Sequence, residues 1–207
     1  MINGETVLAV IPARGGSKRC PRKNLRPFRG EPLLWWSILC ARDSRYIDRI
    51  VLSTEDQEIR DYAKQHVSVI HRPDYLASDT ASNEDVLRHV LGLIETRWVV
   101  LLQPASPLRW SLDIDSCIEM AQPIHGVERP VISVRRSDGS KNGAVYVCRS
   151  KWLLEGHNFG EPFIPYLMPD DRSLDIDYPE QLEDSDDARK AAELIEGDRR
   201  ILHKVYG

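Results

Sequence analysis

A basic, glycine-containing loop stands directly after the first apolar run of the chain. Residues 7–11 read VLAVI, and residues 12–24 continue as PARGGSKRCPRKN. Gly15 and Gly16 permit a tight backbone whose N–H groups can face an anion, while Arg14, Lys18 and Lys23 add fixed positive charge. The spacing G-x-x-x-x-G-K-[ST] of a P-loop is missing, which excludes that class of ATPase. A flexible basic surface loop would have the same composition, but the position after a strand favours phosphate binding.

Two further polar loops follow apolar runs. Residues 71–80 read HRPDYLASDT, in which Arg72 can form a planar pair of hydrogen bonds with a carboxylate, a phosphate or a base carbonyl. The alternative is a surface ion pair for Arg72, with residues 79–82 capping the next helix. Residues 101–109 read LLQPASPLR, where two prolines fix Gln103 at a strand end and its amide can meet a ligand with little loss of entropy. The alternative is a rigid loop leading into a helix capped by Ser111.

The fourth motif is acidic. Residues 173–179 read SLDIDYP, so Asp175 and Asp177 alternate with apolar residues and would share one face of a strand. Two carboxylates on one face repel each other unless a cation lies between them, and beside a triphosphate Mg²⁺ is the expected cation. The alternative is an exposed edge strand in which Asp177 caps the following helix.

The elements that must position these loops alternate along the chain. Strands are predicted at 7–11, 49–53, 67–70 and 98–102, and helices at 33–43, 55–66 (with Thr54 as N-cap) and 83–95. This alternation predicts an α/β fold, a mostly parallel sheet with helices on both faces, whose ligands bind at the carboxyl ends of the strands. The loops after Ile11, Ile70 and Leu102 all lie at such ends, which predicts one shared site. Residues 131–134 and 144–148 predict further strands, and residues 179–196 a charged helix.

Composition narrows the class of protein. The 207 residues carry a formal net charge of -4 and are 42% hydrophobic and 29% charged, which is typical of a soluble globular protein and argues against a nucleic-acid binder. No apolar run approaches the ~18 residues of a membrane span, and the N-terminal residues do not read as a signal peptide. The four cysteines are widely separated, which argues against a disulfide framework or a structural zinc site. We expect one cytoplasmic domain spanning residues 1–207.

Taken together in this order, the motifs resemble those of the acylneuraminate cytidylyltransferases, also called CMP-sialic acid synthetases. The similarity covers about residues 7–108 and resumes at 142–146 (NGAVY) and 173–182. The family transfers CMP from CTP to the anomeric hydroxyl of a 2-keto-3-deoxy sugar acid and releases pyrophosphate. The resemblance therefore implies a Rossmann-like fold of the nucleotide-diphospho-sugar transferase type, CTP as substrate, Mg²⁺ as cofactor and an acidic sugar as acceptor.

The resemblance also implies roles for individual residues. Residues implied to hold the triphosphate are Arg14, Gly15, Gly16, Ser17, Lys18 and Lys23, with Arg14, Lys18 and Lys23 acting in catalysis. Residues implied around the nucleotide and the acceptor's entry are Asn24, Arg72, Ser78, Gln103, Asn142 and Gly143. Asp175 and Asp177 match the metal ligands of the family. These roles agree with the physics of the motifs, because cations and Mg²⁺ neutralise a triphosphate and stabilise leaving pyrophosphate.

This chain departs from the family between Val134 and Asn142. The family usually carries a much longer segment there, which supplies basic residues to the acceptor and part of a dimer contact. Only Arg135 to Lys141 stand in its place, so either the acceptor is different or smaller, or the sequence omits a segment. A homodimer is implied by the resemblance and put in doubt by the short segment. Three functions stay open: a synthetase for a sialic, legionaminic or pseudaminic acid, cytidylyl transfer to 3-deoxy-octulosonic acid or a phosphonate, and a catalytically silent nucleotide-binding paralogue.

Overall fold

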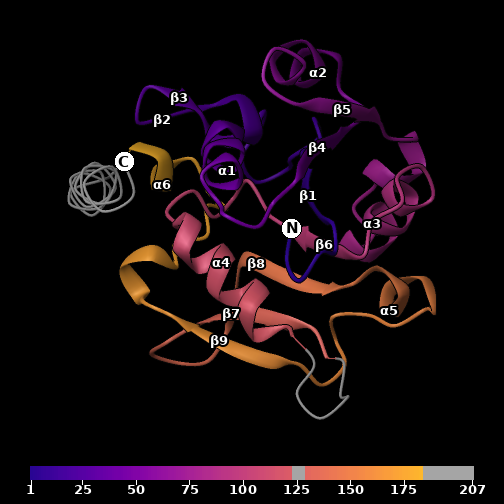
Figure 1. Cartoon of the computed structure of the whole chain (residues 1–207). Helices are drawn as coiled ribbons and strands as arrows, with labels where there is room; N and C mark the ends of the chain where they lie inside the picture. Colours follow the sequence, from indigo (N-terminus) through magenta and orange to yellow (C-terminus); the bar gives the residue numbers. More distant parts are fainter. Residues whose placement is uncertain (123–128, 184–207) are drawn as a thin grey trace.

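The computed structural model describes residues 1–122 and 129–183 (Figure 1). The strands are β1 (Val7–Pro12), β2 (Pro27–Phe28), β3 (Glu31–Pro32), β4 (Arg49–Thr54), β5 (Ser68–His71), β6 (Trp98–Leu101), β7 (Val131–Arg135), β8 (Lys141–Arg149) and β9 (Ile164–Met168). The helices are α1 (Leu33–Arg42), α2 (Gln57–Ala63), α3 (Asn83–Leu91), α4 (Ser111–Met120), α5 (Ser150–Leu154) and α6 (Glu180–Glu183), with 3-10 turns at Lys23–Leu25, Asp74–Ala77 and Asp170–Arg172.

One mixed sheet organises the described residues. Its seven strands lie in the order β5-β4-β1-β6-β8-β7-β9. The pairs β4–β5, β1–β4, β1–β6 and β7–β9 are parallel, whereas β8 runs antiparallel to both of its neighbours. The prediction of a mostly parallel sheet is confirmed. The carboxyl ends of β1, β4, β5 and β6 therefore share one edge, where the polar loops of the sequence follow.

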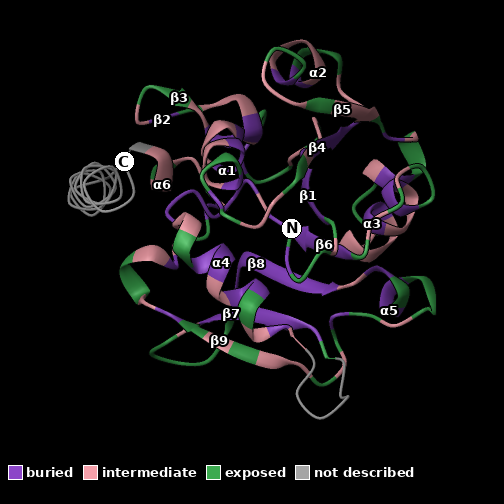
Figure 2. Cartoon of the chain, in the orientation of Figure 1, coloured by how far each residue is buried: buried purple, intermediate pink, exposed green. Residues whose placement is uncertain are grey.

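Helices cover both faces of this sheet, as predicted. Alternate residues of β1 enter different cores, because successive side chains of a strand point to opposite faces. Ala9 packs in a cluster with residues of α1, α2 and α4, while Val10 packs in a second cluster with residues of α3 and α5. Figure 2 shows β1, β6 and β8 buried between these layers. Strands that are buried on both faces explain the near-continuous apolar runs of the sequence.

The predicted helices are found with shorter bounds, four of the predicted strands with longer ones, and two helix caps differ from those considered. The helix predicted at 55–66 is α2, and its N-cap is Asp56, whose side chain accepts the Ile59 N–H at 2.9 Å. Thr54 instead accepts the Asp56 N–H, which orders the turn before the cap. Ser111 is the first residue of α4 rather than its cap, and the Trp110 N–H is bound by Asp113. The predicted helix 179–196 is described only as α6, and its remainder lies outside the described residues.

The acidic segment 173–177 is a loop, so the predicted strand for Asp175 and Asp177 is wrong. Its backbone pairs with no strand. The Ile176 N–H donates to the Ala105 carbonyl at 2.8 Å, and the Ile176 side chain is buried in a small cluster with Phe28, Leu33 and Leu108. Burial of Ile176 between two polar neighbours produces the same alternation of apolar and charged residues that a strand would show.

The short segment between β7 and β8 forms a tight hairpin. The Arg135 N–H donates to the Ser140 carbonyl at 2.7 Å, and the Gly139 N–H donates to the Arg135 carbonyl at 2.8 Å. Gly139 has a φ of 70°, which a glycine adopts without steric cost, and Asp138 accepts the Ser140 N–H at 2.8 Å. No helix in the described part of the chain combines the length and apolar character that a membrane crossing needs.

Candidate active site

A pocket of about 240 Å³ lies at the carboxyl edge of β1, β5 and β6. The loops that form it are the three predicted from the sequence to share a site, together with the first turn of α3. The lining residues that carry polar side chains are Arg14, Lys23, Asn24, Arg72, Ser78, Asp79, Ser82, Asn83 and Gln103. Six of the predicted site residues are thus brought to one cavity from three separate stretches of the sequence.

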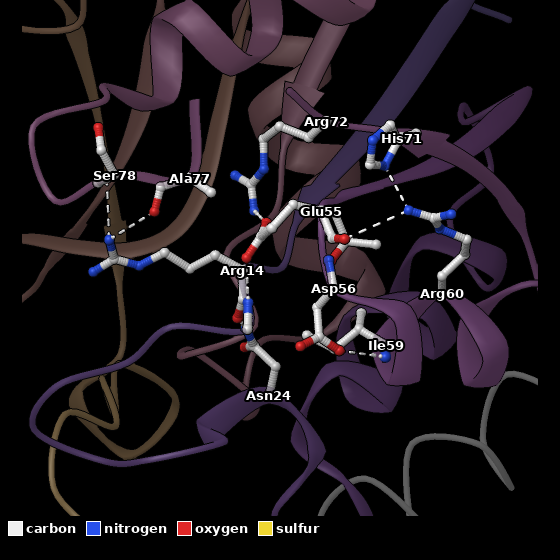
Figure 3. Close-up of polar contacts among 12 residues, drawn as sticks. Arg14, Asn24, Glu55, Asp56, Ile59, Arg60, His71, Arg72, Ala77 and Ser78 are labelled. Carbon is white, nitrogen blue, oxygen red and sulfur yellow. Dashed lines mark hydrogen bonds and ion pairs between the residues drawn. The ribbon is translucent and has the colours of Figure 1, made fainter. Parts of the chain in front are cut away.

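Arg14 and Asn24 connect the basic loop to the rest of the pocket (Figure 3). The Asn24 side chain donates to the Arg14 carbonyl at 2.9 Å, which ties the two ends of the loop together. The Arg14 guanidinium reaches across the pocket and donates to the carbonyls of Ala77 and Ser78 at 3.4 and 3.1 Å. Arg14 therefore bridges the loop after β1 and the loop after β5.

Glu55 contacts both the basic loop after β1 and the loop after β5. One of its carboxylate oxygens accepts the Gly15 N–H at 2.7 Å, and the other pairs with Arg72 at 2.9 Å (Figure 3). The side chain of Arg72 is only 4% exposed, and this burial lowers its pKa while the charge of Glu55 opposes the shift. A buried guanidinium with one carboxylate partner keeps its charge and can donate further hydrogen bonds to an anionic ligand.

Asp79 pairs with two of the predicted phosphate ligands. Its carboxylate lies 2.9 Å from Arg14 and 2.5 Å from Lys18. The hydrogen bond with Lys18, followed by that with Arg14, lowers the pKa of Asp79. Lys18 is exposed and outside the pocket lining, so this pair is what brings its ammonium group to the pocket edge.

Lys23 joins the basic loop to the acidic segment. Its ammonium group donates to the Ile176 carbonyl at 2.6 Å and lies 3.4 Å from Asp177, which also pairs with Arg19 at 2.9 Å. Asp175 is exposed, yet the surrounding protein removes enough water from its carboxyl to raise its pKa, and the charge of Asp177 raises it further. Two carboxylates with mutual repulsion beside a cationic loop form a site that a small divalent cation would relieve.

The donor chemistry of this pair suits Mg²⁺. Carboxylate oxygens are hard ligands, and Mg²⁺ in nucleotide sites takes one or two of them together with phosphate oxygens and water. No group of three or more His, Cys, Asp or Glu side chains with metal-binding geometry occurs among residues 1–122 and 129–183. A metal at Asp175 and Asp177 would therefore depend on a phosphate ligand for its remaining coordination.

The other predicted residues lie outside the pocket lining. Gly16 and Ser17 lie in the loop between Arg14 and Lys18, with Gly16 exposed. Gly143 has a φ of 72°, and a Cβ there would lie 3.2 Å from the Ser106 hydroxyl, so a glycine permits close packing behind Gln103. Asn142 is 3% exposed and hydrogen-bonds to other protein groups. Its side chain is not placed for the nucleotide contact that the resemblance implies.

Sequence reasoning missed Glu55 and the ion-pair role of Asp79. Glu55 directly follows β4, which neighbours β1 in the sheet, so the rule that ligands bind beyond strand ends could have identified it. Thr54 was read as the helix N-cap, which made Glu55 the first residue of a helix rather than a site residue. Asp79 stands in a segment that we read as a possible cap.

Comparison with known proteins identifies the family of this chain. The family model described as Cytidylyltransferase matches residues 8–136. The chain is 31% identical to the CMP-N,N'-diacetyllegionaminic acid synthase of Legionella pneumophila over 84% of this chain and 91% of that protein. It is 29% identical to the N-acylneuraminate cytidylyltransferase of Escherichia coli O18:K1:H7 over 83% of this chain, and spans 49% of that longer relative.

Solved structures give the same fold. A CMP:2-keto-3-deoxy-manno-octonic acid synthetase complexed with CTP superposes with a TM-score of 0.74 over 93% of this chain and 99% of that one, at 16% identity. A cytidylyltransferase from Leptospira borgpetersenii superposes with a TM-score of 0.67 over 95% of this chain and 96% of that one, at 17% identity. With the family model spanning more than half of the sequence and a relative matched over most of its length, the chain belongs to the cytidylyltransferase family and is a nucleotidyltransferase.

Proposed function

We propose that the protein transfers CMP from CTP to the anomeric hydroxyl of a sialic-acid-like 2-keto-3-deoxy sugar acid and releases pyrophosphate. The observation that carries the proposal is the pocket in which Arg14, Lys23 and Arg72 converge, with the carboxylate of Asp177 3.4 Å from Lys23. The named relatives act on legionaminic and neuraminic acids, which supports this class of acceptor.

In this proposal the basic loop receives the triphosphate. Arg14, Lys18 and Lys23 neutralise its oxygens, and the N–H groups of Gly16 and Ser17 contribute dipoles, while the Gly15 N–H is held by Glu55. The acceptor hydroxyl attacks the α-phosphorus and releases its proton to water, a phosphorus–oxygen bond forms, and the bond to the β-phosphate breaks with both electrons leaving on pyrophosphate. Asn24, Arg72, Ser78 and Gln103 orient the nucleoside, and Gly143 supports Gln103 from behind.

Asp175 and Asp177 would hold Mg²⁺ in the same proposal. When bound, the metal neutralises the triphosphate and stabilises the negative charge that develops on the leaving group. The chain's own contribution is the pairing of Asp177 with Lys23 and Arg19, which holds this carboxylate beside the basic loop. The negative charges of Asp175 and Asp177 repel each other, so a cation is most favourable at this segment.

The acceptor side is open in this chain. The hairpin between β7 and β8 is satisfied within its own turn, which supports a native short connection over an omitted segment. An acceptor would therefore be recognised without the longer family segment. A second acceptor class has a specific observation behind it, since a 3-deoxy-manno-octulosonate cytidylyltransferase of Acidobacterium capsulatum is 43% identical over 36% of this chain and 31% of its own length.

The experiment measures pyrophosphate release with each of the four nucleoside triphosphates against a panel of acceptors. The panel contains neuraminic, legionaminic, pseudaminic and 3-deoxy-octulosonic acids and a phosphonate. We expect release with CTP and a nine-carbon acid. If only the eight-carbon acid or the phosphonate supports release, the proposed nine-carbon acceptor is wrong and that compound takes its place. Release with ATP or GTP but not CTP would overturn the proposed specificity for cytosine.

Three properties of the whole protein belong to the same proposal. The chain forms one domain, numbered 1–207, and the reaction takes place in the cytoplasm, which the wide spacing of the four cysteines along the sequence supports. A homodimer stays a prediction of the family resemblance. Sedimentation of the purified protein at several concentrations tests it, and a single monomeric species throughout would exclude it.

A further inference from the structure

We propose that Asn142 is a positioning residue that sets the place of the acidic segment 173–177, rather than a nucleotide contact. The proposal rests on the metal role assigned above to Asp175 and Asp177. It concerns how these two carboxylates, which stand on a loop, are held in a fixed position. The argument starts from the buried polar groups around the amide of Asn142.

The Asn142 side chain lies in a fully occupied hydrogen-bond network. Its carbonyl oxygen accepts from the Ser133 hydroxyl at 2.7 Å and from the Ala144 N–H at 3.2 Å. Its amide nitrogen donates to the Ser173 hydroxyl at 2.9 Å and to the Met168 sulfur at 3.4 Å. An Asn amide offers two donors and two acceptor positions, so none is left for a nucleotide.

The partners of Asn142 fix the orientation of its amide. A flipped amide would place its NH₂ group against the Ala144 N–H, donor facing donor. Ser133 also accepts the Val145 N–H at 2.8 Å, and Ser173 donates to the Pro169 carbonyl at 2.8 Å, so both hydroxyls have complete hydrogen bonding. All three side chains are at most 3% exposed, and breaking one bond would leave a polar group unpaired away from water.

This network anchors the acidic segment at its first residue. Ser173 takes the Asn142 bond through its side chain, and its carbonyl accepts from Arg135 at 3.1 Å. Three residues later, the Ile176 N–H binds the Ala105 carbonyl and the Ile176 carbonyl binds Lys23. Asp175 lies between the two anchors, and Asp177 follows the second.

The same network reaches the loop that carries Gln103. The Ser106 hydroxyl donates to the main-chain carbonyl of Asn142 at 2.9 Å, and Ala105 of this loop is the backbone partner of Ile176. Asn142 therefore connects three parts of the site: the strands β7 and β8, the loop after β6 and the acidic segment. Groups that hold ligands in place from behind commonly change metal affinity about 10–100-fold when they are removed.

The test compares Asn142→Ala and Ser173→Ala with the wild-type protein. Hydrogen–deuterium exchange without CTP or metal reports the segment directly, and we expect severalfold faster exchange in the peptide covering 173–177. The apparent Mg²⁺ constant for pyrophosphate release should rise about tenfold in both variants. CTP binding in EDTA should stay within about twofold of wild type, because both substitutions keep the main-chain carbonyl of Asn142 that binds Ser106, and neither Asn142 nor Ser173 lines the nucleotide pocket.

The double variant and a control separate positioning from general loosening. If Asn142 acts through Ser173, the double variant should raise the Mg²⁺ constant no further than Asn142→Ala alone. The control is Ser150→Ala, which removes a buried hydroxyl with no hydrogen-bond partner among the described residues, on α5. It should leave exchange at 173–177 and the Mg²⁺ constant unchanged.

Two results would overturn the inference. Unchanged exchange at 173–177 in both variants would show that the network does not hold the segment. A loss of CTP affinity in EDTA that matches the loss with Mg²⁺ would make Asn142 a nucleotide contact. If no triphosphate supports pyrophosphate release in the wild type, the proposed function fails, while the exchange measurement still decides whether Asn142 positions the segment. Should Asn142→Ala not fold, Ser173→Ala alone tests the same contact by removing one oxygen atom.

Discussion

At the scale of single residues, the site contains charges whose electrostatic energy is unfavourable without a ligand. Asp175 has a raised pKa, so the folded chain binds its proton more tightly than the unfolded chain does. Its contribution to stability is therefore most favourable at low pH and is lost as the pH rises through the raised pKa. A residue that lowers stability at neutral pH is typical of a functional site.

We predict that Asp175→Asn stabilises the metal-free protein and impairs catalysis. At pH 7 in EDTA the melting temperature should rise by about 1–2 °C, a small gain because the residue is exposed and its charge is screened. Pyrophosphate release with Mg²⁺ should fall by roughly 10²–10³-fold. The difference in melting temperature should vanish as the pH falls below the ordinary pKa of an aspartate. A variant that is less stable than wild type at every pH would contradict this account.

Two neighbouring glycines give a second residue-scale prediction. A Cβ at Gly15 would overlap the carboxylate of Asp56, which caps α2 and pairs with Arg22, whereas a Cβ at Gly16 would meet nothing within 4 Å. Gly15→Ala should lower the free energy of unfolding by about 1–2 kcal/mol through the displaced cap, and weaken CTP binding. Gly16→Ala is the matched control and should leave both quantities near wild type. Urea denaturation and calorimetric titration with CTP measure the pair, and equal losses in both variants would exclude the Asp56 explanation.

At the scale of elements, α3 links helix capping to the pocket. Ser82 and Asp85 form a capping box, with the Ser82 hydroxyl accepting the Asp85 N–H at 3.1 Å, and Ser82, Asn83 and Val86 line the pocket. Ser82→Ala should lower the free energy of unfolding by about 1 kcal/mol. Ser111→Ala, at the first residue of α4, removes no cap and should cost less than about 0.5 kcal/mol. Chemical denaturation of the two variants checks this contrast, and a larger loss in Ser111→Ala would mean that the capping assignment of α4 is incorrect.

The sequence allowed the elements to be predicted where one physical signal dominated. Apolar runs of three to five residues identify β1, β4 and β6 because these strands are buried between two helical layers. The order of strands was not predictable, since no local pattern records that β8 runs antiparallel beside β6. The segment 173–177 was misread because a loop that buries Ile176 has the same two-residue period as a strand.

Much of the site could be predicted from the positions of residues after strands. The prediction for Asn142 failed because its contacts come from distant parts of the chain. Arg14, Arg72 and Gln103 stand within two residues of a strand end, so the parallel topology alone brings them together. Asn142 was assigned a nucleotide-binding role because its motif was recognised. Its hydrogen-bond partners Ser133 and Ser173 lie 9 and 31 positions away along the chain and meet it only in the folded structure. Buried hydrogen-bond networks of this kind leave no periodic trace in the sequence.

At the scale of the whole molecule, the site joins segments that are far apart in the chain. The pocket takes residues from 12–24, 72–83 and 103–105, and Lys23 ties these to the acidic segment 173–177. A ligand that bridges the basic loop and the acidic segment should therefore stabilise the entire fold, because any compound that binds only the folded state raises its free energy of unfolding. If Mg²⁺ increases the stabilisation by CTP, the basic loop and the acidic segment 173–177 bind the same ligand.

We therefore predict that CTP and Mg²⁺ raise the melting temperature more than the sum of their separate effects. At a CTP concentration of 100 times the dissociation constant the free energy of unfolding should rise by about 2.7 kcal/mol, and chelation of the metal should remove most of this gain. Thermal denaturation with CTP, Mg²⁺, both or neither measures the coupling, with ATP as the control nucleotide. In Asp175→Asn the CTP effect should persist in EDTA while the added effect of Mg²⁺ disappears, since the basic loop is intact and the metal ligand is not. If Mg²⁺ adds equally to wild type and variant, the metal binds the free nucleotide or another part of the protein, and the acidic segment has no share in the site.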